Sequence, residues 1–455
     1  MKCPKTLRYI GLDVHKKWIQ FCMVNRQGHV VREGRFMATA AAIGDFARSL
    51  RPTDAVALEA TGFTWALVDR LEQHAGRLVV SNPLQTRAIA HAKVKTDKVD
   101  ALVLAQLLRL DYLPTVWRPD AQTRAWRQAV HFRAMFVRRR TQLKNQIHAI
   151  FHRRLRAFDG ADLFGKTGRQ WIATERQALP ERDRLELDIL LDELDRTDER
   201  IAVLSEALAR EVYRIDDVRL LMTIPGVDIY AAVSLLAAIG DIARFPSAKH
   251  LASYFGLVSR VSQSGEHCWT GRITKRGRSH ARWIAIQSAQ HLCRAPGPMH
   301  HFYQHIKKRK GHNVAIVAVA RKLVTLAWHI LTKREPYRYS VPRTTETKLS
   351  RLRVLATGKK KKTGPRVGTA RSKNYGTGQR VKYAKSLNQV YRENELPPLG
   401  SLPKGERTML RRRGLHAWAE KNIHKGKPIV TIRNNGKRSK PKTADREKTQ
   451  REHVV

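Results

Sequence analysis

The chain has 455 residues, of which 42% are hydrophobic, so it is long enough for two or three domains that each bury a core. Lysine and arginine number 87 against 39 acidic residues, which gives a formal net charge of +48. Such a chain repels itself unless a polyanion binds it, so nucleic acid is the expected partner. The sequence has no signal-peptide pattern and no uninterrupted apolar run of about 18 residues, and its four cysteines are scattered. We therefore expect a soluble intracellular protein rather than a membrane protein or a disulfide-rich secreted domain.

Strand-like segments open the chain. Residues 8–14 and 18–24 are rich in apolar, β-branched and aromatic side chains, and His15, Lys16 and Lys17 separate them. Residues 25–28 (Asn-Arg-Gln-Gly) then turn the chain toward Val30 and Val31. This pattern predicts a three-stranded antiparallel meander.

Helices and strands alternate through the rest of the first 119 residues. The predicted elements are a helix over 39–50, a strand over 55–59, a helix over 63–75, a strand over 77–81 and a helix over 96–110. Thr96 is placed to cap the start of the last helix. The alternation indicates an α/β domain over residues 1–119.

Three further regions follow. Residues 120–216 contain a single proline and are rich in Arg, Leu, Glu and Gln, which predicts long helices paired as a coiled coil. Residues 217–335 have the pattern of a mainly α-helical domain with a polar loop at 258–275. Residues 336–455 hold 32 basic and 8 acidic residues and few large apolar ones. We expect this last region to be a basic tail that is disordered without nucleic acid.

Four carboxylates fall where they can meet. Asp13 ends the first predicted strand, Glu59 ends the fourth, and Asp97 and Asp100 lie one turn apart at the start of the helix over 96–110. In a ribonuclease-H-like sheet these two strands are neighbours, and a helix across their ends gathers all four groups. Two Mg²⁺ ions about 3.5–4 Å apart would neutralise them and serve phosphodiester cleavage. A single acidic residue at a strand end or helix start is common and helps solubility or the helix dipole, so the prediction depends on the joint pattern.

The segments that carry these carboxylates resemble the Asp, Glu, Asp, Asp signature of the DEDD-type insertion-sequence transposases, now called bridge recombinases. They are residues 11–16 (Gly-Leu-Asp-Val-His-Lys), 58–62 (Leu-Glu-Ala-Thr-Gly) and 95–101 (Lys-Thr-Asp-Lys-Val-Asp-Ala). The resemblance covers roughly residues 8–330. It implies a RuvC-like N-terminal domain whose four carboxylates bind Mg²⁺, and a structured non-coding RNA as a guide.

A second set of motifs is similar to the family's C-terminal domain. It consists of Gly240-Asp241, residues 251–257 (Leu-Ala-Ser-Tyr-Phe-Gly-Leu), Ser264-Gly265 and residues 275–277 (Lys-Arg-Gly). The resemblance implies that Ser264 is the nucleophile that joins covalently to a DNA end, with Ser262 as the alternative. On residue type alone, a serine before a glycine is usually a turn residue. Arg278-Ser279 replaces a segment that more often contains asparagine in the family.

Basic residues in two places are expected to contact nucleic-acid phosphates. They are Arg272, Lys275, Arg276 and Arg282 after the serine loop, and Arg138, Arg139, Arg140 and Lys144 on the first long helix.

These features predict a bacterial transposase that cuts and rejoins donor and target double-stranded DNA through a composite site, in which the bound Mg²⁺ assists attack by Ser264. We expect a homodimer or tetramer in the cytoplasm, associated with the nucleoid when it acts and with no membrane. One alternative is a Mg²⁺-dependent nuclease resembling Holliday-junction resolvases, without covalent serine chemistry. The other is a non-catalytic nucleic-acid-binding protein, although converging carboxylates would repel nucleic acid.

Overall fold

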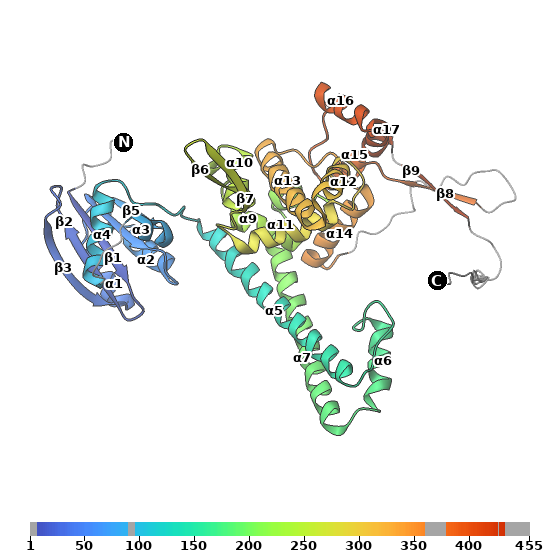
Figure 1. Cartoon of the computed structure of the whole chain (residues 1–455), viewed down its shortest axis with the longest axis horizontal. Coiled ribbons are helices and arrows are strands. Elements are labelled where there is room, and N and C mark those ends of the chain that lie inside the picture. Colours follow the sequence, from blue (N-terminus) through green and yellow to red (C-terminus); the bar gives the residue numbers. More distant parts are fainter. Residues whose placement is uncertain (1–6, 90–95, 360–378, 426, 433–455) are drawn as a thin grey trace. The chain divides into compact units, whose positions relative to one another are not determined.

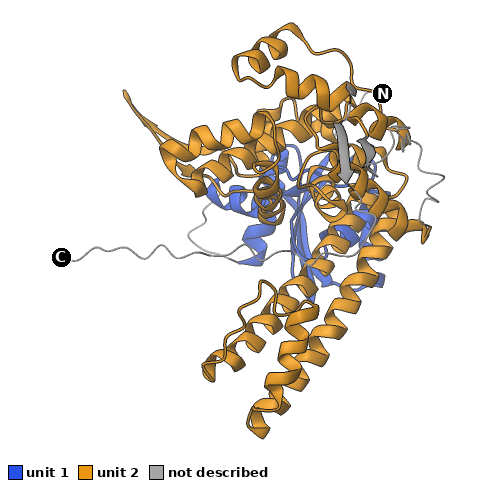
Figure 2. Cartoon of the chain, turned by 90° about the vertical axis from the view of Figure 1, so that its right-hand side faces the viewer, with its two compact units in different colours: residues 1–119 blue, residues 120–455 orange. Residues whose placement is uncertain are grey.

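The computed structural model describes residues 7–89, 96–359, 379–425 and 427–432, and Figure 1 labels its helices and strands. The chain forms two compact units, Met1–Pro119 and Asp120–Val455, which Figure 2 distinguishes by colour.

A five-stranded mixed sheet forms the centre of the first unit. Its strands are β1 (Arg8–Val14), β2 (Trp18–Val24), β3 (Val30–Met37), β4 (Asp54–Glu59) and β5 (Arg77–Ser81). They lie in the order β3-β2-β1-β4-β5, with β1, β2 and β3 antiparallel and with β4 and β5 parallel to β1. The predicted meander and the two later strands are confirmed. Strand β3 continues past Val31 because it pairs with β2 as far as Met37.

Helices cover both faces of this sheet. They are α1 (Ala40–Arg48), α2 (Thr64–Leu71), the short α3 (Pro83–Ile89) and α4 (Asp97–Arg109). Leu12 and Leu58 pack with α1 and α2 in one apolar cluster, whereas Ala57 packs with α4 in another. The Thr96 hydroxyl accepts a hydrogen bond from the Val99 N–H, so the predicted N-cap is confirmed. A mixed sheet with these helices is compatible with a ribonuclease-H-like domain.

Two long helices begin the second unit. Helix α5 (Ala121–Arg153) and helix α7 (Glu181–Val212) lie side by side and run in opposite directions, and α6 (Lys166–Arg176) lies between them in the chain (Figure 1). Ile147 of α5 and Leu187 of α7 belong to one buried cluster at the end where α6 packs.

The next elements build a helical domain. They are α8 (Asp216–Leu221), α9 (Ile229–Ile239), the 3-10 turn η1 (Ile242–Arg244), α10 (Ala248–Tyr254), the hairpin of β6 (Ser259–Ser264) and β7 (His267–Ile273), α11 (Ser279–Leu292), α12 (Pro298–Lys310) and α13 (His312–Lys333). Helix α13 is long and apolar enough to cross a membrane by length and composition alone. It carries Arg321 and Lys322, however, and Val319, Ala320 and Leu323 are fully buried in this domain. It therefore serves as a core helix.

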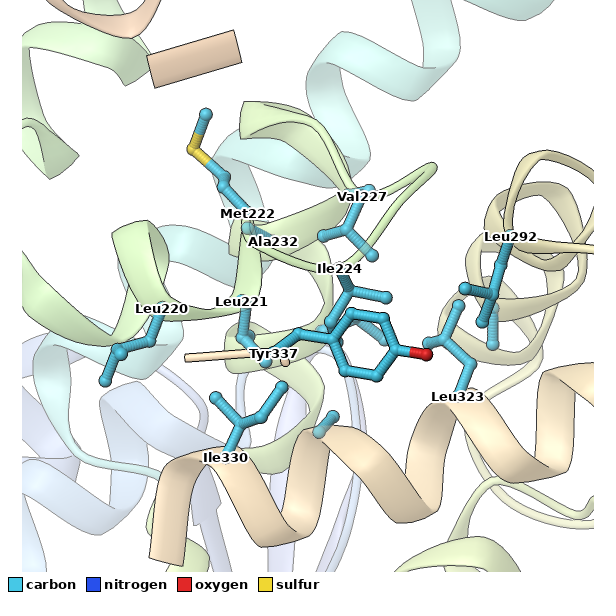
Figure 3. Packing of buried hydrophobic residues seen from close by; sticks show 14 of the residues in the cluster. Leu220, Leu221, Met222, Ile224, Val227, Ala232, Leu292, Leu323, Ile330 and Tyr337 are labelled. Carbon is cyan, nitrogen blue, oxygen red and sulfur yellow. The ribbon is translucent and has the colours of Figure 1, made fainter. Parts of the chain in front are cut away.

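The expectation of a disordered tail over 336–455 is wrong for much of that region. It contains α14 (Pro342–Thr357), β8 (Gln379–Ala384), α15 (Leu387–Glu393), α16 (Lys404–Arg412), α17 (His416–Glu420), the π-helical turn η2 (Lys421–Lys425) and β9 (Lys427–Ile432). Figure 3 shows Tyr337 packed among Leu221, Ile224, Leu323 and Ile330. Apolar residues that are sparse in the sequence meet partners from distant segments here, so composition alone hides the core. Residues 360–378 and 433–455 lie outside the described residues.

Lys348 of α14 ties this region to the turn between α8 and α9. Its Nζ donates to the carbonyl oxygens of Met222, of Ile224 at 2.8 Å and of Val227 at 3.0 Å. An ammonium group has three N–H donors, so these three carbonyls satisfy it fully. The turn is thus held from within the domain core.

Candidate active site

Strand alternation points Asp13 and Glu59 to the same face of the sheet. Strands β1 and β4 pair in parallel as far as Leu12 opposite Leu58. Both leucines face α1 and α2. Successive side chains on a strand point to opposite faces, so the two carboxylates that follow point to the α4 side. Both are partly exposed at the carboxyl ends of their strands.

Helix α4 lies tightly against β1 at Gly11. A Cβ atom at Gly11 would lie 2.0 Å from the Ala101 carbonyl oxygen and 2.6 Å from the Ala105 amide nitrogen. Ala101 and Ala105 are fully buried, so small residues on both elements allow this approach. The first turn of α4, which carries Asp97 and Asp100, is thereby brought to the end of β1. Carboxylates are favoured there by the helix dipole as well.

His15, which the sequence motifs did not single out as a site residue, joins these carboxylates. Its Nε2 lies 2.9 Å from Asp13 Oδ2 and 3.3 Å from Asp97 Oδ1. The Trp18 indole N–H also donates to Asp97, at 3.4 Å. Ligand atoms of Asp13, His15 and Asp97 all lie within 4.8 Å of one another. The signal in the sequence that could have identified His15 is its position two residues after the aspartate at the end of a strand.

Glu59 and Asp100 lie outside this three-residue group. The structure therefore brings Asp13 and Asp97 within reach of one ion, with Asp100 close enough to interact electrostatically with Asp13. Glu59 follows Leu58 on the neighbouring strand, at the level of Asp13.

The electrostatics of the group fit a cation. Burial raises the pKa of Asp13 above its ordinary value, and the nearby Asp97 and Asp100 carboxylates raise it further, while His15 opposes the shift. Burial and neighbouring carboxylates both disfavour the charged form of Asp13, and a bound cation would favour it. The carboxylate oxygens are donors of the type that hard divalent cations prefer. The group can therefore hold a divalent metal ion.

Ser264 lies at the end of an exposed hairpin in the second unit. It pairs with His267, and Gly265 in the two-residue turn has a φ of +57° with no atom near its missing Cβ. Ser262 pairs with Trp269 two residues away, so both serines lie on the same face of the strand. Both are exposed. The hairpin can therefore present either hydroxyl to a large substrate.

The basic residues singled out after the serine loop differ in their surroundings. Arg272, Lys275 and Arg276 are exposed, and Lys275 has a φ of +54° at the base of the hairpin. Arg282 is partly buried, and one guanidinium nitrogen donates to the carbonyls of Phe255 and Arg276. Arg282 therefore holds the loop in shape.

The basic residues on α5 also fall into two groups, exposed ones and ones that contact other side chains. Arg138 and Arg139 are exposed, whereas Arg140 lies 3.3 Å from Asp198 of α7 and Lys144 lies over the Phe164 ring. The first two are the better placed for a partner.

Comparison with known proteins accounts for both sets of motifs. Residues 10–153 match a family described as Transposase, the DEDD transposases of the IS110 type. Residues 218–304 match the Transposase IS116/IS110/IS902 family. These two segments contain the four carboxylates and Ser264. The chain belongs to the DEDD-type insertion-sequence transposases.

Relatives of this transposase align along most of their own length. The transposase for insertion sequence element IS1111A of Coxiella burnetii is 27% identical over 73% of this chain and 92% of that protein. A probable family 20 transposase of Pseudomonas aeruginosa is 29% identical over 73% of this chain and 99% of that protein. A pilin gene-inverting protein of Moraxella lacunata is 27% identical over 62% of this chain and 80% of that protein. The resemblance seen in the sequence is confirmed, and the protein is a DNA transposase.

Proposed function

We propose that this transposase cuts and rejoins DNA with Asp13, Glu59, Asp97 and Asp100 as ligands of two Mg²⁺ ions and with Ser264 as the nucleophile. The observation that carries the proposal is the packing of α4 against β1, which brings Asp13 and Asp97 from two separate segments within reach of one ion, while β4, whose last residue is Glu59, pairs beside β1. Acidic groups at this density repel one another and DNA, so their cost is offset only when cations bind.

Bound Mg²⁺ supplies Lewis-acid stabilisation of charge on phosphodiester oxygens. The residues of the chain orient and hold this site. His15 contacts both Asp13 and Asp97 and fixes the direction of the two carboxylates, and the Trp18 indole donates to the second of them. The four proposed ligands are carboxylates, which suit hard cations such as Mg²⁺, with His15 as a partner of two of them.

The serine step is a transesterification. The Ser264 Oγ bonds to the phosphorus, its proton passes to a base, and the sugar oxygen on the far side leaves and takes up a proton. The phosphoserine ester conserves the energy of the broken phosphodiester, so a second sugar hydroxyl can reverse the reaction and rejoin a strand. An exposed hairpin with a glycine turn suits a nucleophile that must reach a DNA backbone.

A structured non-coding RNA is proposed to guide the protein to donor and target DNA. Base pairing would then supply the sequence specificity. The protein, with its net charge of +48, would recognise the shape of the nucleic-acid helices and bind their phosphate backbones. We propose a homodimer or tetramer that acts in the cytoplasm at the nucleoid. Sequencing RNA that copurifies with the full chain tests the guide, and recovery of random cellular RNA alone would contradict it.

Isosteric substitutions test the metal site. We expect Asp13→Asn, Glu59→Gln, Asp97→Asn and Asp100→Asn to abolish strand cleavage while DNA binding persists, because the loss of metal ligands affects chemistry more than docking. The matched control is Asp45→Asn, an exposed aspartate on α1 of the same unit that pairs with Arg48. Full cleavage by any two of the four site variants would contradict the assignment.

Adduct trapping tests the serine. Wild-type protein and Ser262→Ala should form a protease-sensitive covalent adduct with labelled DNA, and Ser264→Ala should form none, as read on a denaturing gel. An adduct retained in Ser264→Ala but lost in Ser262→Ala would move the nucleophile by two residues. Cleavage by the wild type without any adduct would instead favour a resolvase-like nuclease that uses only the carboxylates.

A further inference from the structure

A hollow at the start of α11 in the second unit has a wall of basic and polar groups. It encloses about 260 Å³ between α5, α9 and the first residues of α11. Its polar wall consists of Arg127, His131, Ser234, Arg278, Ser279 and His280. Among the described residues that line it, none is acidic. Neither Ser262 nor Ser264 is among its lining residues.

Two arginines of this wall are fixed in position. The Nε of Arg127 donates to the Ala237 carbonyl of α9 at 2.7 Å, and the Nε of Arg278 donates to the Tyr254 hydroxyl at 3.2 Å. Burial and the neighbouring Arg278 lower the pKa of Arg127 to about 10, which still leaves it charged at neutral pH. Each guanidinium carries several N–H groups in a rigid plane that matches a phosphate.

Positive charge is in excess around these arginines. Burial by itself would raise the pKa of Tyr254, yet that pKa lies below its ordinary value because the Arg278 and Arg244 cations favour the phenolate. Burial, followed by the cations of Arg278, Arg138 and Arg127, likewise lowers the pKa of His131. At Tyr254 the cations outweigh burial, and at His131 they add to it, so the field at both groups is positive. An anion would therefore be stabilised here.

The first turn of α11 opens into the hollow. This helix has 14 residues, and its N-cap residue, Arg278, supplies no side-chain acceptor. The residues of that turn that line the hollow are Ser279, His280 and Ala281. The first N–H groups of a helix lack partners within the helix and favour an anion. Gly277 sets this start close to α10, since a Cβ there would lie 2.1 Å from the Tyr254 carbonyl oxygen.

A buried hydroxyl lies in the wall of the hollow. Ser234 of α9 is 2% exposed and lines the hollow. Its hydroxyl interacts with the Tyr230 hydroxyl one turn earlier, and Tyr230 donates to the Val130 carbonyl at 3.0 Å and lies 3.1 Å from His280 Nε2. A serine hydroxyl is a donor that a phosphate oxygen can accept from.

We propose that this hollow binds one backbone phosphate of the DNA on which the transposase acts. Arg127, Arg278, the start of α11 and Ser234 together offer charge and donors around one anion. Ser279 and His131 at its rim are exposed, so a strand can continue on either side. The proposal rests on the proposed function only because it requires that the protein binds DNA. Its test measures neither strand cleavage nor adduct formation.

One substitution at the rim of the hollow should weaken DNA binding without destabilising the fold. Ser279→Asp places a carboxylate in the first turn of α11. The helix dipole stabilises a carboxylate there, and the carboxylate competes with a phosphate for the same place. We expect the thermal midpoint of the full chain to stay level or rise, while affinity for a duplex DNA oligonucleotide falls about 10-fold or more. The log–log salt slope should fall by about 0.9, the value of one lost phosphate contact. Arg278→Gln should lower the same slope.

Two controls and two competitors complete the experiment. Ser279→Asn keeps the shape without the charge, and Gln128→Glu adds one charge at an exposed position of α5 that does not line the hollow. Gln128→Glu should bind DNA as the wild type does, and Ser279→Asn should bind DNA more tightly than Ser279→Asp. DNA affinity of Ser279→Asp equal to that of Gln128→Glu would overturn the proposal. The proposal would also fail if inorganic phosphate raised the thermal midpoint of the wild type but not of Ser279→Asp, while both proteins bound DNA with equal affinity. It would fail as well if Ser279→Asp lost affinity only for an RNA hairpin and not for the DNA duplex.

Discussion

Adding a single methyl group at Gly11 should disable the metal site without touching any carboxylate. The Cβ of Gly11→Ala would lie 2.0 Å from the Ala101 carbonyl oxygen, whereas a carbon and a carbonyl oxygen approach to about 3.3 Å at closest. Helix α4 must therefore move by roughly 1.3 Å, and Asp97 and Asp100 move with it. Overpacking of this kind costs about 1–3 kcal/mol of unfolding free energy. A displacement near 1 Å at a catalytic group can cost on the order of 100-fold in rate.

The assay measures urea unfolding and strand cleavage on the same preparations of Gly11→Ala and Gly44→Ala. Gly44 lies on α1, where a new Cβ would come no closer than 3.6 Å, to the end of the Arg48 side chain. Alanine there should leave stability level or raise it by up to about 1 kcal/mol. Wild-type stability and cleavage in Gly11→Ala would show that α4 does not depend on this close approach, and the account of the site would fail.

Further predictions concern the second unit and the thiols. Lys348→Met should lower the unfolding free energy by about 3 kcal/mol or more, because three buried carbonyls lose their donor; an unchanged urea midpoint would contradict this. Deletion of 433–455, which holds eight basic residues, should lower the salt slope of DNA binding. Deletion of 336–455 removes the buried Tyr337 and Lys348 and should prevent folding of the second unit. Exposed Cys268 should react with iodoacetamide at pH 8 at least about 10-fold faster than Cys22, because burial raises the pKa of Cys22 to about 11. Peptide mapping that finds equal labelling would refute it.

Local patterns in the sequence determined much of the first unit. Runs of apolar, β-branched and aromatic residues identified β1 and β2, and Thr96 with the helical spacing after it identified α4, because these signals depend on neighbouring residues alone. The carboxylates at the ends of these elements suggested a metal-dependent nuclease, and the resemblance of their segments and of the motifs around Ser264 to a known family indicated a transposase.

Only the tertiary structure decided which of these residues meet, and at what distance. His15 becomes a partner of Asp13 and Asp97 because Gly11 admits α4, a packing fact that no local pattern encodes. The region after residue 336 appeared disordered because disorder is judged from average composition, whereas Tyr337 is buried by partners more than a hundred residues earlier in the chain. The hollow at α11 likewise joins residues from α5, α9 and α11. Long-range contacts of this kind depend on how the helices and strands pack together, so the sequence around each residue does not predict them.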